Sequence, residues 1–137
     1  MSADSQWPLQ QAVYTALAGD AALLGLIGNP ARVFDHAPQD SAFPYVVIGE
    51  ATSGAFDTKT EDGMEQALTI HTWSRYRGLK ETKQIMAAVL DALDQQALTV
   101  PGHELILLRF TFGATFLDPD GLTRHGVQRF RAVTQAA

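Results

Sequence analysis

The sequence contains no cysteine among its 137 residues. That absence excludes a disulfide framework, a thiolate metal site and a cysteine nucleophile. The chain also has no apolar run long enough to span a bilayer, and its start, MSADSQWPLQ, lacks the basic and apolar stretches of a secretory signal. A formal net charge of −5 argues against a general nucleic-acid binder. We therefore expect a protein made in a reducing cytoplasm, with no membrane partner.

Motifs that carry catalysis or hold cofactors are missing as well. The sequence has no G-x-S-x-G, P-loop or G-x-G-x-x-G pattern. The four histidines are His36, His71, His103 and His125. None stands two, three or four residues from another, the spacing that places two metal ligands together within one element. The acids near residue 60 lack the ligand spacing of an EF-hand, and a lysine sits among them. We expect no cofactor, no metal and no enzymatic activity.

Hydrophobic periodicity predicts the secondary structure. Helical stripes and capping residues predict helices over 6–18, 21–27 and 79–93, and β-rich runs predict strands over 32–34, 45–50 and 65–74. Residues 105–117 and 122–134 are expected to form a long hairpin around the turn sequence DPDG. Residues 51–64 look like a long polar loop. The order predicts one α+β domain over 1–137, with a mostly antiparallel sheet of four or five strands and two to three helices on one face.

The faces of the C-terminal hairpin follow from its alternation. Leu108, Phe110, Phe112 and Phe116 fall on one face at period two and are expected in the core, while Arg109 falls on the other. Stacking platforms for single-stranded nucleic acid need aromatics and bases on one face, so this separation argues against nucleic-acid binding. Both tryptophans, at positions 7 and 73, are interpreted as packing residues.

Charge divides unevenly along the chain. Residues 1–72 carry nine acids and two bases, a net of −7, whereas residues 73–137 carry eight bases and six acids, a net of +2. Chance is one interpretation; the other is a head-to-tail interface between copies of the chain. The candidate subunit-interface residues are Arg75, Arg77, Arg109, Arg129 and Arg131. The 51–64 loop is either an unstructured insertion or an arm that contacts a partner, through Phe56, Asp57, Lys59, Glu61 and Asp62.

Several segments together resemble a known family. They are GDAALLGLIG followed by RVFDHAP, the strand FPYVVIGE, and W-S-R-x-x-G-x-x-E leading into a helix with VLDALD. In order and spacing they are similar to the DUF3168 family of phage-type tail-completion (tail terminator) proteins, which also occurs in gene transfer agents. The resemblance covers nearly the whole chain.

The resemblance implies a structural virion protein of a phage or phage-like particle, made in the bacterial cytoplasm. Such proteins form a hexameric ring that caps the tail tube, stops its polymerisation and meets the head–tail connector, while DNA passes through the lumen without specific binding. The implied partners are other copies of the chain, the tail tube protein and the connector or stopper protein. The alternatives are another neck component, a module that binds peptides by strand addition, and a small hydrolase that uses His71 with a nearby acid.

Overall fold

The computed structural model describes residues 3–137 and contains three helices and five strands within that range. The helices are α1 (Gln6–Ala18), α2 (Ala21–Ile27) and α3 (Lys80–Leu93). The strands are β1 (Val33–Phe34), β2 (Tyr45–Ala55), β3 (Gly63–Ser74), β4 (His103–Leu117) and β5 (Arg124–Ala136).

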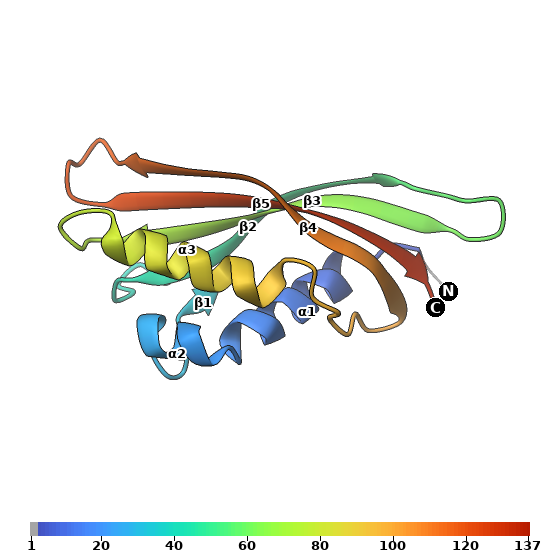
Figure 1. The fold of residues 1–137 in the computed structure, drawn as a ribbon, viewed down its shortest axis with the longest axis horizontal. Helices are drawn as coiled ribbons and strands as arrows, with labels where there is room; N and C mark the ends of the chain where they lie inside the picture. Colours follow the sequence, from blue (N-terminus) through green and yellow to red (C-terminus); the bar gives the residue numbers. More distant parts are fainter. Residues whose placement is uncertain (1–2) are drawn as a thin grey trace.

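All five strands belong to one sheet with the order β1-β2-β3-β5-β4. The pairs β2–β3, β3–β5 and β5–β4 are antiparallel, and only the two-residue β1 runs parallel to its neighbour β2. The three helices lie together on one side of the sheet and leave the other side open (Figure 1). The α+β architecture predicted from the sequence, with a mostly antiparallel sheet and a long C-terminal hairpin, is confirmed.

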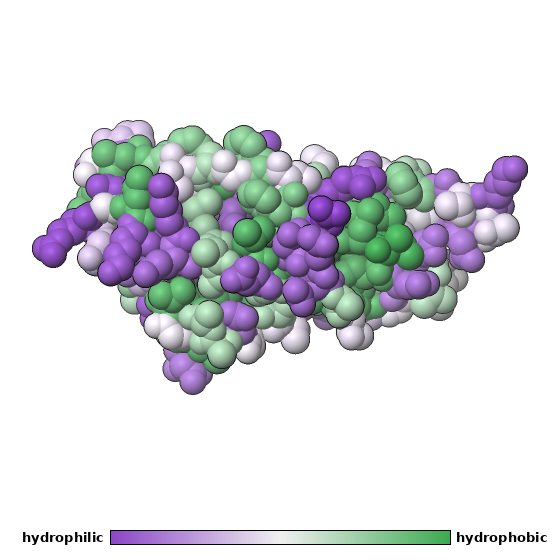
Figure 2. Space-filling model, in the orientation of Figure 1, coloured by the Kyte–Doolittle hydropathy of each residue, from purple (hydrophilic) through white to green (hydrophobic). Residues whose placement is uncertain are grey.

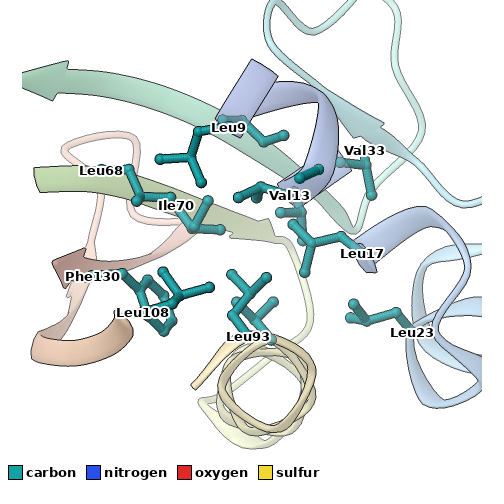
Figure 3. Close-up of a cluster of buried hydrophobic side chains, with 14 of the residues drawn as sticks. Leu9, Val13, Leu17, Leu23, Val33, Leu68, Ile70, Leu93, Leu108 and Phe130 are labelled. Atoms are coloured by element: carbon teal, nitrogen blue, oxygen red, sulfur yellow. The ribbon is translucent and has the colours of Figure 1, made fainter. Parts of the chain in front are cut away.

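The core lies between the helices and the sheet. In Figure 3, Leu9, Val13 and Leu17 of α1 and Leu93 of α3 point toward Ile70 of β3 and its neighbours. Phe130 is the largest side chain that is fully buried. Burying aliphatic and aromatic side chains of this size is the main favourable term that holds helices on a sheet.

Local sequence signals explain where several elements begin and end. Asp20 caps α2, because its carboxylate accepts a hydrogen bond from the backbone N–H of Leu23 at 3.1 Å. In the predicted DPDG turn, Gly121 has a φ of 70°, which a glycine adopts without strain. Asp120 accepts hydrogen bonds from the backbone N–H groups of Leu122 and Thr123, and these hold its carboxyl pKa at about 2. The turn therefore fixes the register of the β4–β5 hairpin.

A glycine on β5 allows α3 to pack close to the sheet. A Cβ at Gly126 would lie 2.6 Å from Sδ of Met86 and 3.1 Å from Cγ2 of Thr82, both on α3. The side-chain amide of Gln128 on β5 also donates to the backbone carbonyl of Met86 at 2.9 Å. Within the part of the chain that the structure describes, none of these helices has the length and apolar character needed to cross a bilayer.

One element differs from its prediction. The prediction of a loop over residues 51–64 is wrong at both ends, since β2 continues to Ala55 and β3 begins at Gly63. Pairing from Ala51 with Leu68 to Ala55 with Met64 turns half of the expected loop into strands of a hairpin that extends away from the helices (Figure 1). Only residues 56–62 connect the two strands.

Candidate functional site

The connection between β2 and β3 is short and ordered. Its loop closes through a hydrogen bond from the Thr58 backbone N–H to the carbonyl of Glu61 at 2.9 Å, and Asp57 accepts from the backbone N–H of Gly63 at 3.1 Å. The five candidate partner-interface residues all lie in this exposed connection: Phe56, Asp57, Lys59, Glu61 and Asp62. We call residues 56–62 the hairpin tip. It forms one end of the elongated molecule (Figure 1).

The aromatic residue of the hairpin tip is not free. The guanidinium of Arg131 on β5 lies 5.6 Å from the centroid of the Phe56 ring, within the range of a cation–π contact. The same guanidinium donates a hydrogen bond to the carboxylate of Glu65 on β3. The base of the tip is therefore held by one arginine shared between a ring and a carboxylate.

The five candidate arginines separate into two groups. Arg109, Arg129 and Arg131 lie on the open face of the sheet, where Arg109 is the register partner of Arg131. Arg75 and Arg77 lie at the other end of the molecule, in the connection from β3 to α3. Arg75 is already engaged, since its guanidinium lies 4.3 Å from the Phe43 ring centroid. The structure therefore brings only three of the five arginines together.

The expectation that the phenylalanines of β4 are core residues is wrong. Phe110, Phe112 and Phe116 have exposed fractions of 38%, 47% and 50%, whereas Leu108 is buried as predicted. A register shift between Phe110 and Phe112 places Phe112 on the open face, opposite Arg129, whose guanidinium lies 5.4 Å from its ring centroid. In Figure 2 hydrophobic patches lie along the course of β4 and are interrupted by hydrophilic residues.

Trp7, which was expected to pack, is also 62% exposed on α1. Trp73 does pack: its ring stacks on that of His125, with centroids 3.8 Å apart and planes 7° from parallel.

The sequence gives no sign of a hydrogen-bonded chain of side chains across the open face. Glu50 on β2 bonds to Nε2 of His71 on β3 at 2.7 Å, and Nδ1 of His71 bonds to Nε2 of His125 on β5 at 2.7 Å. A Cβ at Gly49 would lie 2.6 Å from the His71 ring, so the glycine leaves room for it. We call Glu50, His71, Trp73 and His125 the histidine chain.

Electrostatics in the histidine chain follow from these contacts. The hydrogen bond from His71 holds the pKa of the Glu50 carboxyl below its usual value. Burial lowers the pKa of His125, and the neighbouring His71 lowers it further. The neutral form of His125 is therefore favoured, and in that form its Nε2 still shares a hydrogen bond with Nδ1 of His71.

An acid next to a histidine is also the arrangement that a hydrolase would use, the alternative raised for His71. In a hydrolase the histidine activates a nucleophilic oxygen or sulfur. Here the third group is a second imidazole, and Glu50 is 66% exposed at the far end. Among residues 3–137, no three or more His, Asp or Glu side chains are placed to hold a metal ion. The hydrogen bonds of the histidine chain hold the rings of His71 and His125 in place on the open face, where Trp73 stacks on His125.

Comparison with known proteins identifies the family. The family described as tail completion protein gp17 matches residues 11–135, nearly the whole chain. The chain belongs to this tail completion protein family. It is 28% identical over 123 residues to the tail completion protein gp17 of Bacillus phage SPP1, covering 90% of this chain and 89% of the phage protein.

Solved structures agree with the family match. A chain of the virion of a native gene transfer agent particle superposes with a TM-score of 0.89 at 28% identity, covering 98% of this chain and all of the other. A second solved structure, with a TM-score of 0.58 at 14% identity, covers 97% of this chain and shares the fold. The resemblance stated from the sequence is confirmed: this is a structural tail protein of a phage or gene transfer agent particle, and it belongs to the virion.

Proposed function

We propose that this tail completion protein forms a ring, six copies in the family pattern, that caps the finished tail tube. The ring ends polymerisation of the tube protein and joins the tail to the head–tail connector. The observation that carries the proposal is the whole-chain likeness, at a TM-score of 0.89, to a chain of an assembled gene transfer agent virion. The proposed role contains no catalytic step and treats 1–137 as one domain.

A terminator needs two different surfaces along the axis of the tail. One must match the end of the tube, and the other must match the connector and refuse further tube protein. The hairpin tip and the connection from β3 to α3 lie at opposite ends of this molecule (Figure 1). The hairpin tip carries Asp57, Lys59, Glu61 and Asp62, whereas the connection from β3 to α3 at the opposite end carries Arg75 and Arg77. We assign the hairpin tip to the tube and the end that carries Arg75 and Arg77 to the connector.

The remaining arginines, Arg109, Arg129 and Arg131, are assigned to contacts between neighbouring copies. β4, β5 and the turn between them carry four bases and three acids, whereas β2, β3 and the hairpin tip carry five acids and one base. Opposite charges on two different surfaces of one chain favour head-to-tail contacts, which close into rings. Acidic side chains along the lumen would let DNA pass, because neutralising phosphates is what makes DNA binding tight.

The test is the length of tails in cells that make the particles. Without the gene for this chain, electron microscopy should find tubes that are longer than normal, irregular in length and not joined to heads. Normal tails joined to heads would overturn the proposal. Over-long tails that still carry a head would favour a terminator without a joining role, and normal-length tails without heads would favour a different neck component.

A variant of the hairpin tip tests its assignment to the tube. Replacing residues 58–61 by Asn-Gly supplies a two-residue turn between the same two strands, so the melting temperature should stay near that of the natural chain. Capping should nevertheless fail, with over-long tails. The control is Asp40→Ala in the exposed connection between β1 and β2, which should leave tail length normal. Normal tails from the shortened tip would remove the tip from the tube contact.

A further inference from the structure

The two outer strands of the sheet each have one half with no partner. On β4, the backbone N–H of Phe110 donates to Asp94 at 2.8 Å and the carbonyl of Leu108 accepts from Gln95 at 2.8 Å. The segment that follows α3 thus covers this half of the edge. Beyond it, within the described residues, residues 112–117 face no other strand on their outer side. Long unprotected edges are templates for pairing with another chain.

At the opposite edge of the sheet, it is the half of β2 level with the free half of β4 that is covered. β1 pairs with Val46 and Val47 of β2 and covers no residue beyond them. Residues 51–55 of β2, with the sequence ATSGA, are all exposed and have a partner strand, within residues 3–137, only on the β3 side. Next to them lies a cavity of about 270 Å³ between α1 and β2, lined by Trp7, Leu9, Val13, Ile48 and Ala51 among others.

Side chains on the two free half-edges differ in size. Phe112, Phe116 and Leu117 of β4 are about half exposed. On β2 the exposed side chains are small, and a Cβ at Gly54 would meet no atom within 4 Å. Large apolar groups on one edge and open space with a cavity on the other are complementary in shape. The hairpin that carries the β2 edge is acidic and the one that carries the β4 edge is slightly basic, so the two are also complementary in charge.

Strand direction favours joining them. Since β2, β3, β5 and β4 alternate in direction, β2 and β4 run opposite ways at the two edges. A neighbour related by rotation would therefore place its β2 antiparallel to β4, with its helices on the same side of the extended sheet. Such a contact is heterologous, as a closed ring requires.

We propose that residues 112–117 of β4 in one copy pair antiparallel with residues 51–55 of β2 in the next copy. Phe112 and Phe116 then lie over Thr52 and Gly54 on the open face, and Leu117 reaches the cavity beside α1. This inference names the subunit contact of the proposed ring and rests on that proposed function.

The offset between the free half-edges fits ring closure. Ala114 on β4 is level with Val47 on β2, through the register of the two strands between them. The middle of the free half of β2 is Ser53, which pairs with Gln66 and so lies five ladder positions farther on, or ~17 Å at the usual rise per residue. Four strands are ~19 Å wide. Closing the ring with this offset tilts the strands by roughly 40° from its axis, the tilt of closed barrels.

Disulfide trapping tests the contact, because the chain contains no cysteine of its own. Facing residues of antiparallel strands have Cα atoms at a distance that a disulfide can bridge. Thr52→Cys is combined in turn with Phe112→Cys, Ala114→Cys and Phe116→Cys, so that three registers are covered. Particles purified from cells that carry each double variant are oxidised and run on a non-reducing gel. At least one pair should give a ladder of covalent oligomers.

The controls separate the possible outcomes. Each single variant should give monomers, and Thr52→Cys with Glu104→Cys, which lies beyond the covered half of β4, should give no ladder. Dimers from a single β4 variant would mean that β4 pairs with itself, and the absence of ladders from all three pairs would mean that the edges do not meet. Either result overturns the inference. Tail length in cells lacking the gene tests the proposed function separately, so each can fail alone.

Matched glycine variants provide a second test in purified protein and in particles. Gly54→Lys and Gly25→Lys make the same change at two positions where a Cβ meets open space, but Gly25 lies on α2, away from both edges (Figure 1). Both variants should melt near the temperature of the natural chain. Gly54→Lys should lower self-association or particle yield by roughly tenfold or more, because a lysine on an edge opposes strand pairing. Equal behaviour of the two variants would overturn the inference.

Discussion

Phe110 and Phe130 form a pair that tests where the stability of the sheet originates. The two residues face each other across β4 and β5, with ring centroids 5.7 Å apart in an edge-to-face arrangement. Phe130 is completely buried, whereas Phe110 is 38% exposed. Replacing each by alanine removes the same atoms and the same ring contact. The difference between the two variants therefore measures burial.

The expected costs are unequal. Phe130→Ala leaves a cavity in the core and should lower the free energy of unfolding by about 3–5 kcal/mol. Phe110→Ala loses the ring contact, about 0.5–1.5 kcal/mol, and part of its burial, for about 1–2 kcal/mol in all. For a chain of 137 residues, the larger cost corresponds to a fall in melting temperature of roughly 10–17 °C.

Urea unfolding followed by circular dichroism gives the free energies by linear extrapolation. Unchanged slopes would show that both variants unfold from the same compact state. Equal losses for the two variants, or a loss below about 2 kcal/mol for Phe130→Ala, would refute the assignment of Phe130 to the centre of the core.

Three further changes have definite expected results. Asp20→Ala removes the acceptor for the backbone N–H of Leu23 and should cost about 1 kcal/mol in urea unfolding, whereas Asp20→Asn keeps an acceptor and should cost less. Because the pKa of His125 is lowered by folding, the folded state binds fewer protons than the unfolded state below the ordinary value of 6.5. Stability should therefore fall as the pH drops through 6.5 toward the lowered pKa, and this slope should be weaker in His125→Gln. Gly126→Ala forces the side chain of Met86 to move and should cost about 1–3 kcal/mol; a melting temperature equal to that of the natural chain would contradict the close approach of α3.

The helices and the C-terminal hairpin were predictable because their signals are local. The apolar stripe of α3, the cap at Asp20 and the turn at 118–121 each lie within a few residues of what they determine. The second half of β2 was missed for the opposite reason. The sequence ATSGA has no alternation of apolar and polar side chains, and it becomes a strand by pairing with β3. That partner lies across the hairpin tip, so a local pattern does not reveal it.

The faces of β4 could not be predicted beyond Phe110. The alternation places Phe112 in the core, but one added residue at the bulge turns it to the open face. A bulge in a β-rich run changes no residue type and leaves no mark on composition. The histidine chain was missed because its members come from three strands, and only the order β2-β3-β5 brings Glu50, His71 and His125 into line.

The coverings on the two edges determine which contact between copies is possible. β1 covers the half of β2 that lies level with the free half of β4, and the segment after α3 covers the half of β4 that lies level with the free half of β2. A second copy that paired edge to edge without an offset would meet a covered half on each side. Under the proposed contact, only a staggered copy finds two free halves, and the same stagger recurs at every step around the ring. Two short segments, neither of them in the contact, would then determine both the offset between subunits and the tilt of the strands.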